Sequence, residues 1–154
     1  MTGAGADPSR SRVGTPAGRL ALIAAMLAGL LLANLAVYAI GRALGGAFTY
    51  RQNGADVRVD PVAVTVMSLV PLVSGLGLVA ALSRKWPAAI LVARIAAPAL
   101  AVATIAVMTI PAGFDTTSAV SLAAMHLTTI PPTLIALNAL PRGSGQDTRR
   151  LPAR

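Results

Sequence analysis

One ionisable side chain, His126, lies near the middle of a long apolar segment that runs from Thr117 to Leu140. Ionisable groups inside a membrane are rare and often mark a ligand, ion or proton site. An imidazole in such a place can also act as a neutral hydrogen-bonding group between packed helices. We favour this packing interpretation, because no apolar segment contains an acidic residue that could accept a proton and desolvation favours the neutral ring.

Three polar side chains from other apolar segments could share a site with His126. Counting about 1.5 Å per residue from the expected outer ends of the helices puts Asn34 and Ser68 at a depth of roughly 10 Å. The same count puts Thr104 at about 9 Å and His126 at about 14 Å. Polar groups in hydrocarbon gain by facing one another. We therefore expect a polar layer in which His126 points inward and bonds Asn34 or a hydroxyl group.

The composition indicates a membrane protein. Of the 154 residues 55% are hydrophobic and only 12% are charged, and the mean hydropathy is +0.71. A soluble domain has about 25% charged residues. The chain has no cysteine, which excludes disulfides and thiol chemistry, and it contains no phosphate-binding loop or paired carboxylates within an apolar segment. One histidine without other strong ligands near it does not predict a metal site, and no cofactor is expected.

Four apolar segments are long enough to cross a bilayer, and they cover residues 20–41, 61–82, 87–110 and 117–140. Backbone polar groups inside lipid must bond internally, so each segment should be helical. The sequence therefore predicts an all-α membrane protein, a bundle of four transmembrane helices within residues 19–141. Residues 1–18 and 142–154 are expected to be disordered tails, the second of them basic. A secretory signal peptide is the alternative for the first segment, but the run is longer than a typical signal core and three further spans follow.

Prolines predict local irregularities in these helices. Pro131 and Pro132 have no N–H for the carbonyls of Leu127 and Thr128, so the fourth helix should kink there. Pro98 should likewise loosen the third helix. Pro61 suits the first turn of the second helix, with Asp60 as its N-cap.

The first loop, residues 43–60, contains Asn53-Gly54, a strong indication of a two-residue hairpin turn. Folding the chain about this turn places apolar residues on one face and opposite charges on the other. The predicted pairs are Gln52–Ala55, Arg51–Asp56, Tyr50–Val57, Thr49–Arg58 and Phe48–Val59. We expect a short extracytoplasmic β-hairpin between the first and second helices, with its apolar face resting on the mouth of the bundle or on lipid headgroups.

Two residues are expected to anchor the chain at the membrane interface. Trp86 follows a basic turn at the start of the third span, where aromatic residues are favoured. Arg94 lies roughly 10 Å along that helix. A substrate role is one interpretation of Arg94, but we favour a side chain that extends back to the headgroups.

The distribution of basic residues predicts the threading of the chain. Ten Lys and Arg residues lie in the two tails, counted with Arg19, in the second loop and at Arg94, whereas three lie in the first loop, counted with Arg42, and none in the third. Positive residues are retained on the cytoplasmic side. We therefore expect a multi-pass protein of the plasma membrane with both termini in the cytoplasm. The arginines flank apolar runs and do not alternate with aromatic residues, which argues against nucleic-acid binding despite the net charge of +8.

The chain resembles an uncharacterised family of small actinobacterial membrane proteins, a domain of unknown function. The resemblance rests on the arginine-flanked first span, on VDPVAVTVMSLVPLVSGL at the entry to the second, and on Met125-His126-Leu127 within SLAAMHLTTIPPTLIALNAL. It covers most of Leu20 to Leu140. The resemblance implies four spans and the place of the histidine, and it implies no activity.

Three classes of function are compatible with these observations. We favour a structural or accessory membrane component, with the lipid bilayer and a second copy or another membrane protein as partners. A small carrier or proton-linked transporter that uses His126 is the alternative, and with only four spans it would act as an oligomer. An enzyme is the least favoured class, because the sequence contains no catalytic constellation.

Overall fold

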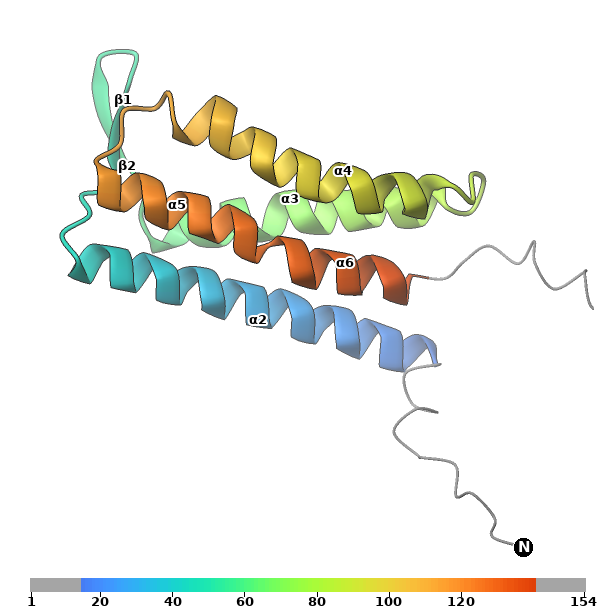
Figure 1. Ribbon diagram of the computed structural model, residues 1–154. Coiled ribbons are helices and arrows are strands. Elements are labelled where there is room, and N and C mark those ends of the chain that lie inside the picture. The colour runs from blue at the N-terminus through green and yellow to red at the C-terminus, as the bar shows by residue number, and fades with distance from the viewer. Residues whose placement is uncertain (1–14, 141–154) are drawn as a thin grey trace, which may run out of the picture.

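The computed structural model describes residues 15–140 of the chain. Its elements are, in order, α2 (Pro16–Ala43), β1 (Thr49–Gln52), β2 (Ala55–Arg58), α3 (Pro61–Leu82), α4 (Ala89–Thr104), the π-helical turn η1 (Ile105–Thr109), α5 (Thr116–Thr128) and α6 (Ile130–Ala139) (Figure 1). Four helices in this part of the chain are long and apolar enough to cross a membrane: Pro16–Ala43, Pro61–Leu82, Ala89–Thr109 and Thr116–Ala139. The predicted fold class, four spans with a hairpin between the first two, is confirmed.

The first helix begins earlier than predicted. The side-chain oxygen of Thr15 accepts a hydrogen bond from the N–H of Gly18 (3.0 Å), and Pro16 occupies the first turn. This cap and the fixed φ of proline start the helix at Pro16. Residues 16–18, which were expected from the sequence to belong to a disordered tail, are therefore helical. The rest of that predicted tail and the predicted tail 142–154 lie outside the described residues.

The second helix, α3, has the predicted bounds. The carboxylate of Asp60 accepts a hydrogen bond from the N–H of Ala63 (2.7 Å), and Pro61 occupies the first turn. Pro71 lies inside the helix. Local sequence was sufficient here, because the cap, the proline and the length of the apolar run all indicate the same two ends.

The third span deviates from an α-helix at a place that its prolines did not predict. α4 runs through Pro98, and the departure comes later, in η1. There the N–H of Ile110 donates to the carbonyl of Ile105 (3.0 Å), a spacing of five residues instead of four. Thr109 at the end of this turn is buried.

The fourth span is divided at Thr129, as its prolines predicted. α5 ends at Thr128, and α6 begins at Ile130 with Pro131 and Pro132 in its first turn. Two hydroxyls bond to carbonyls beside the break: Thr129 donates to His126 (2.6 Å), and Thr133 donates to Thr129 (2.6 Å). Side-chain donors thus take up part of the hydrogen-bonding capacity of the carbonyls at the break.

The hairpin has the register that Asn53-Gly54 predicted. β1 and β2 are antiparallel, with the pairs Thr49–Arg58, Tyr50–Val57, Arg51–Asp56 and Gln52–Ala55. Asn53 and Gly54 have φ values of 52° and 83°, the left-handed conformation that this turn requires. The ring of Tyr50 packs on Phe114 in the loop between η1 and α5 (centroids 5.1 Å apart), so the apolar face of the hairpin rests on that loop.

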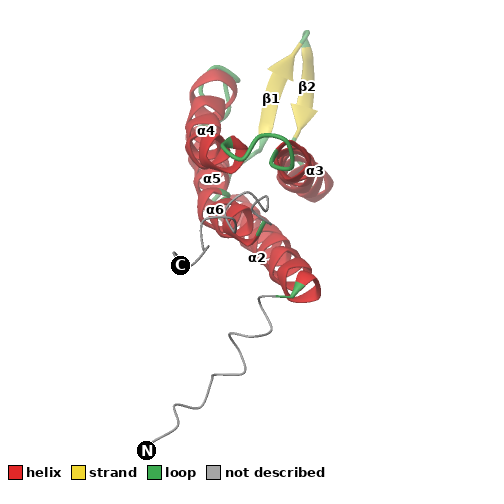
Figure 2. Cartoon of the chain, turned by 90° about the vertical axis from the view of Figure 1, so that its right-hand side faces the viewer, coloured by secondary structure: helices red, strands yellow, loops and turns green. Residues whose placement is uncertain are grey.

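The helices pack with the fourth span in the middle. Figure 2 looks along the helix axes and shows α5 and α6 between α2 on one side and α4 on the other, which agrees with the contacts between these elements. We call the end that carries β1 and β2 the hairpin side, and the opposite end, where α2 begins and α6 ends, the termini side (Figure 1). One apolar cluster contains Phe48, Val64 and Met125, and a second contains Leu76, Ala136 and Leu137.

Candidate functional site

A buried hydrogen-bonded layer joins three of the four spans. The side-chain amide of Asn34 on α2 donates from Nδ2 to Oγ of Ser68 on α3 (2.8 Å). The hydroxyl of Thr128 on α5 donates to Oδ1 of Asn34 (2.7 Å). Asn34 is 2% exposed and Ser68 is 9% exposed. The amide therefore uses its acceptor and one of its donors across two helix interfaces, which satisfies much of its hydrogen-bonding capacity away from water.

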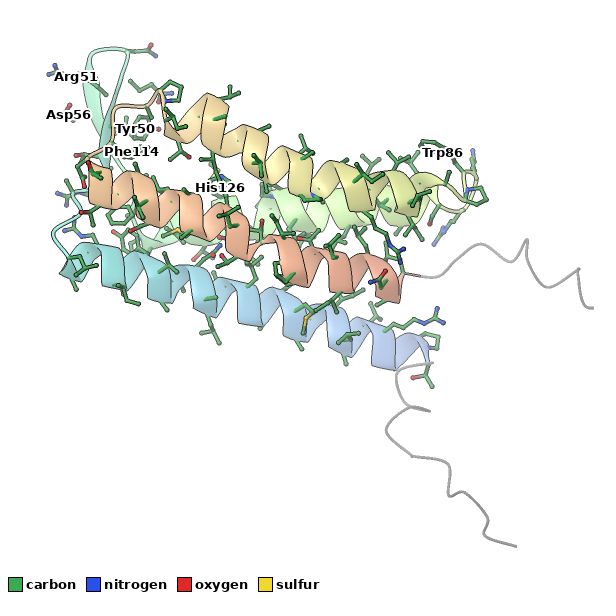
Figure 3. The ribbon with its side chains drawn as sticks, viewed as in Figure 1. Tyr50, Arg51, Asp56, Trp86, Phe114 and His126 are labelled. Carbon is green, nitrogen blue, oxygen red and sulfur yellow. The ribbon has the colours of Figure 1, made fainter. Side chains whose placement is uncertain are left out.

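His126 lies outside this layer, so the prediction that it bonds Asn34 or a neighbouring hydroxyl is wrong. Its Nδ1 is 2.8 Å from the carbonyl oxygen of Leu122 on the same helix. His126 and Thr128 are two residues apart, which corresponds to a rotation of about 200° around a helix. Because Thr128 faces α2, His126 faces away from α2, and Figure 3 shows it on the side of α5 toward α4.

The contact with Leu122 fixes the tautomer of the imidazole. A carbonyl oxygen only accepts hydrogen bonds, so Nδ1 must carry the hydrogen in this arrangement. In the neutral ring Nε2 then has a free lone pair and is the atom that could accept a proton or a ligand donor. The ring is half-buried and lies on the side of α5 toward α4 (Figure 3).

Thr104, the fourth residue of the expected layer, also bonds within its own helix. Its hydroxyl donates to the carbonyl of Leu100 (2.7 Å). Of the four residues that depth alone grouped together, the structure joins Asn34 with Ser68 and leaves His126 and Thr104 apart. The residue that completes the layer is Thr128. The sequence signal that could have identified it is its depth, which is close to that of His126 because the two residues are only two positions apart.

A second polar cluster, which was not predicted from the sequence, closes the hairpin side. The backbone N–H of Phe48 donates to Oγ of Ser118 (2.8 Å), and that hydroxyl donates to Oδ2 of Asp115 (2.6 Å). The same carboxylate accepts from the N–H of Ala47 (3.0 Å) and, through Oδ1, from the N–H of Ser118 (2.9 Å). These bonds fasten the end of the first loop to the start of α5.

Asp115 is consequently held as a carboxylate. The hydroxyl and then the backbone N–H of Ser118 lower the pKa of Asp115 below its usual value of 3.8, and the N–H of Ala47 lowers it further. Partial desolvation opposes this shift but is smaller than the leading hydrogen bonds. The pattern is that of a helix N-cap whose carboxylate also fixes a neighbouring loop.

The aromatic ring of Phe48 fills the interior beneath this cluster. Phe48 is fully buried although its φ is 53°, a conformation that is costly for a bulky residue. Its ring lies 4.7 Å from that of Tyr38, centroid to centroid. A Cβ atom added to Gly41 would lie 2.8 Å from the ring, and one added to Gly46 would lie 2.9 Å from it. The two glycines are therefore required for the ring to enter.

The two expected interface anchors occupy different surroundings at the termini side. Trp86 is half-exposed in the turn before α4 (Figure 3). The side chain of Arg94 also contacts the protein itself: its Nη2 donates a hydrogen bond to Oδ1 of Asn138 on α6. Its Nε is buried and has no hydrogen-bond partner among residues 15–140.

The described part of the chain contains no group of three or more His, Cys, Asp or Glu side chains that could hold a metal ion. The candidate polar groups are the Asn34 layer, the single imidazole, the Asp115 cluster and the guanidinium of Arg94. This arrangement and the four apolar helices define a multi-pass membrane protein.

Comparison with known protein families assigns the chain to one of them. The model of DUF6069, a family of unknown function, matches residues 13–136, and the chain belongs to this family. Curated proteins and solved structures gave no significant match.

Proposed function

We propose that this protein is a structural or accessory component of a membrane and has no catalytic activity of its own. The proposal rests on the hydrogen-bond partners of the polar side chains in the spans, all of which are groups of the protein itself. Asn34, Ser68 and Thr128 bind one another, and His126 binds a carbonyl of its own helix. Other hydroxyls donate to backbone carbonyls of their own span, namely those of Thr65, Thr104, Ser121, Thr129 and Thr133. Polar groups bound in this way stabilise helix packing and present little to a substrate.

A proton-linked carrier is the second candidate, and it depends on Nε2 of His126. That nitrogen has a free lone pair in the neutral ring, and α5, which carries His126, contacts η1, a π-helical turn of a kind that often occurs at functional sites. A path across the membrane would need more than one histidine, so the carrier would act as an oligomer.

Proton flux into proteoliposomes separates the two candidates. An accessory component should give the flux of protein-free vesicles when a pH gradient is imposed, both as the native chain and as His126→Leu. A carrier should give a flux that His126→Leu removes and that Thr104→Val, the matched loss of a polar group on the neighbouring span, leaves intact. A proton flux that His126→Leu removes and Thr104→Val leaves intact would overturn the accessory role.

An accessory component also needs a partner, and α2 offers a surface for one. Ala25, Gly29 and Ala33 are exposed, and a Cβ added to Gly29 would meet nothing within 4 Å. Small residues let a second helix, from another copy or from another membrane protein, approach closely. Gly29→Leu should reduce copurification of that partner in mild detergent, whereas Gly75→Leu, at a similarly open glycine on α3, is the control.

We further propose that the termini side faces the cytoplasm and that the membrane is the plasma membrane. The ten-to-three excess of Lys and Arg supports this orientation. A reporter fused after Arg154 should be active only as a cytoplasmic reporter, and a cysteine introduced at Gly54 should react with a membrane-impermeant reagent on intact cells. Labelling of the C-terminal end from outside the cell would show that the orientation is the opposite of the one proposed.

A further inference from the structure

The guanidinium of Arg94 is a charged group inside a predicted span without a charged partner. Its one hydrogen-bond acceptor among the described residues is Oδ1 of Asn138, which is neutral. All three acidic residues of the described part, Asp56, Asp60 and Asp115, belong to the hairpin or cap helices at the hairpin side. An arginine within a span normally pairs with another group or reaches water, because an uncompensated charge in hydrocarbon is costly.

The whole termini side shares this lack of negative charge. Its basic residues within the described part are Arg19, Arg84, Lys85 and Arg94, with no acidic residue among them. The neutralising anion for Arg94 must therefore come from outside residues 15–140. An anionic membrane surface is one such source, and basic pockets between membrane helices bind anionic lipid headgroups.

Arg94 lies close to the termini-side end of its helix. α4 begins at Ala89, so Arg94 lies about 7.5 Å along the helix. Side chains on a helix lean toward its N-terminus, and the long apolar stem of arginine extends the charge further in that direction. The guanidinium is thus directed back toward the termini-side surface of the membrane.

The donors that remain on the two side chains suit a phosphate. Nε is buried and Nη2 is shared with Asn138, which leaves the outer edge of the guanidinium for a ligand. Arginine binds phosphate oxygens through two parallel N–H donors on one edge. Asn138 is exposed, so its amide N–H groups are accessible to a further oxygen.

Apolar side chains next to Arg94 favour a lipid over a free phosphate. Leu91 and Ile95 on the same helix are 60% and 68% exposed. They provide an exposed apolar surface for acyl chains beside the charge. We propose that Arg94 and Asn138 bind the phosphate of an anionic phospholipid in the leaflet on the termini side.

Ligand-dependent unfolding of the full chain in a neutral detergent tests this proposal. The chain has one tryptophan, Trp86, in the turn before α4, so its fluorescence reports on this end of the molecule. Short-chain phosphatidylglycerol should raise the unfolding temperature in a saturable way. Short-chain phosphatidylcholine and inorganic phosphate are the comparison ligands and should have much smaller effects. Equal stabilisation by inorganic phosphate would show a free-anion site, and equal stabilisation by phosphatidylcholine would show that lipid charge is not recognised; either result overturns the proposal.

Substitutions locate the site. Arg94→Gln should weaken phosphatidylglycerol binding about tenfold, the loss expected for a hydrogen bond to a charged group. Arg84→Gln removes the same charge from the exposed turn and should change the affinity less than about twofold, because exposed charges contribute little. If Arg94→Gln does not fold, Arg94→Lys keeps the charge, loses the planar pair of donors and should bind more weakly than the native chain. Equal losses in the Arg84 and Arg94 variants would mean a diffuse basic surface and would contradict the site.

Discussion

The hairpin side and the termini side of this protein handle charge in opposite ways. At the hairpin side three arginines are accompanied by three aspartates, and Arg42 donates from Nη1 to the carbonyls of Gly46 and Ala47 (2.9 Å each). Asp115 binds backbone N–H groups of the first loop and of α5. At the termini side, four described basic residues face no described acid.

This difference indicates which end is closed by the chain itself. The first loop at the hairpin side reaches the start of α5 by hydrogen bonds from Ala47 and Phe48, and the ring of Phe48 fills the space beneath. The termini side has no comparable loop over the helices within residues 15–140 (Figure 1). We therefore expect the hairpin side to be rigid without a ligand and the termini side to depend on its membrane surroundings.

The largest expected effect comes from Phe48→Ala. Removing a fully buried ring leaves a cavity, and large-to-small substitutions of this kind cost about 3 kcal/mol or more. Trp86→Ala, the matched loss of an aromatic ring at the termini side, should cost less than about 0.5 kcal/mol, because Trp86 is half-exposed. The free energy of unfolding of each variant can be followed by circular dichroism during a titration with denaturing detergent. Similar losses of unfolding free energy in Phe48→Ala and Trp86→Ala would contradict the expectation that the hairpin side is the end closed by the chain itself.

A smaller effect is expected for the layer between the two ends. Asn34→Leu removes two hydrogen bonds between helices, each of which contributes about 0.6 kcal/mol on average, so we expect a loss of about 1 kcal/mol. The loss is limited because the hydroxyl of Thr128 also lies 2.8 Å from the carbonyl of Met125 and can bond there alone. Ser68→Ala in the same titration should lose about half as much. A loss of 3 kcal/mol or more in Asn34→Leu would show that the layer, and not Phe48, holds the helices together.

The smallest effect is a pH dependence confined to the hairpin side. The folded state lowers the pKa of Asp115, so its contribution to stability is complete above the usual value of 3.8 and is lost as the pH falls through the lower, folded value. Amide chemical shifts of Ala47 and Ser118 should move on acidification from about pH 6 to about pH 3, while those of Ala89 at the termini side should not.

Asp115→Asn provides the control for this titration. The amide side chain keeps an oxygen that can accept from Ala47 or Ser118 but has no proton to gain over that range. The shifts of Ala47 and Ser118 should then be independent of pH. A response at Ala89 as large as that at Ala47 would show that acid acts on the whole molecule.

Much of the architecture follows from sequence alone. The four spans, the bounds of α3, the break before Pro131 and the register about Asn53-Gly54 were predicted and are present. Each depends on local physical chemistry: backbone hydrogen bonding that lipid cannot supply, a capping carboxylate, a missing N–H, or a turn that requires positive φ. These forces act between residues that are close in sequence, so the sequence determined them.

The candidate site was decided by tertiary structure. Depth along a helix can be counted from sequence, but rotation about the helix axis is set by packing against neighbouring helices. That rotation turns Thr128 and not His126 toward Asn34. The same holds for Phe48, which continues the predicted strand in sequence yet turns into the interior with positive φ, because Gly41 and Gly46 leave room for its ring. Contacts between residues far apart in sequence favour these arrangements over the local preferences of the chain.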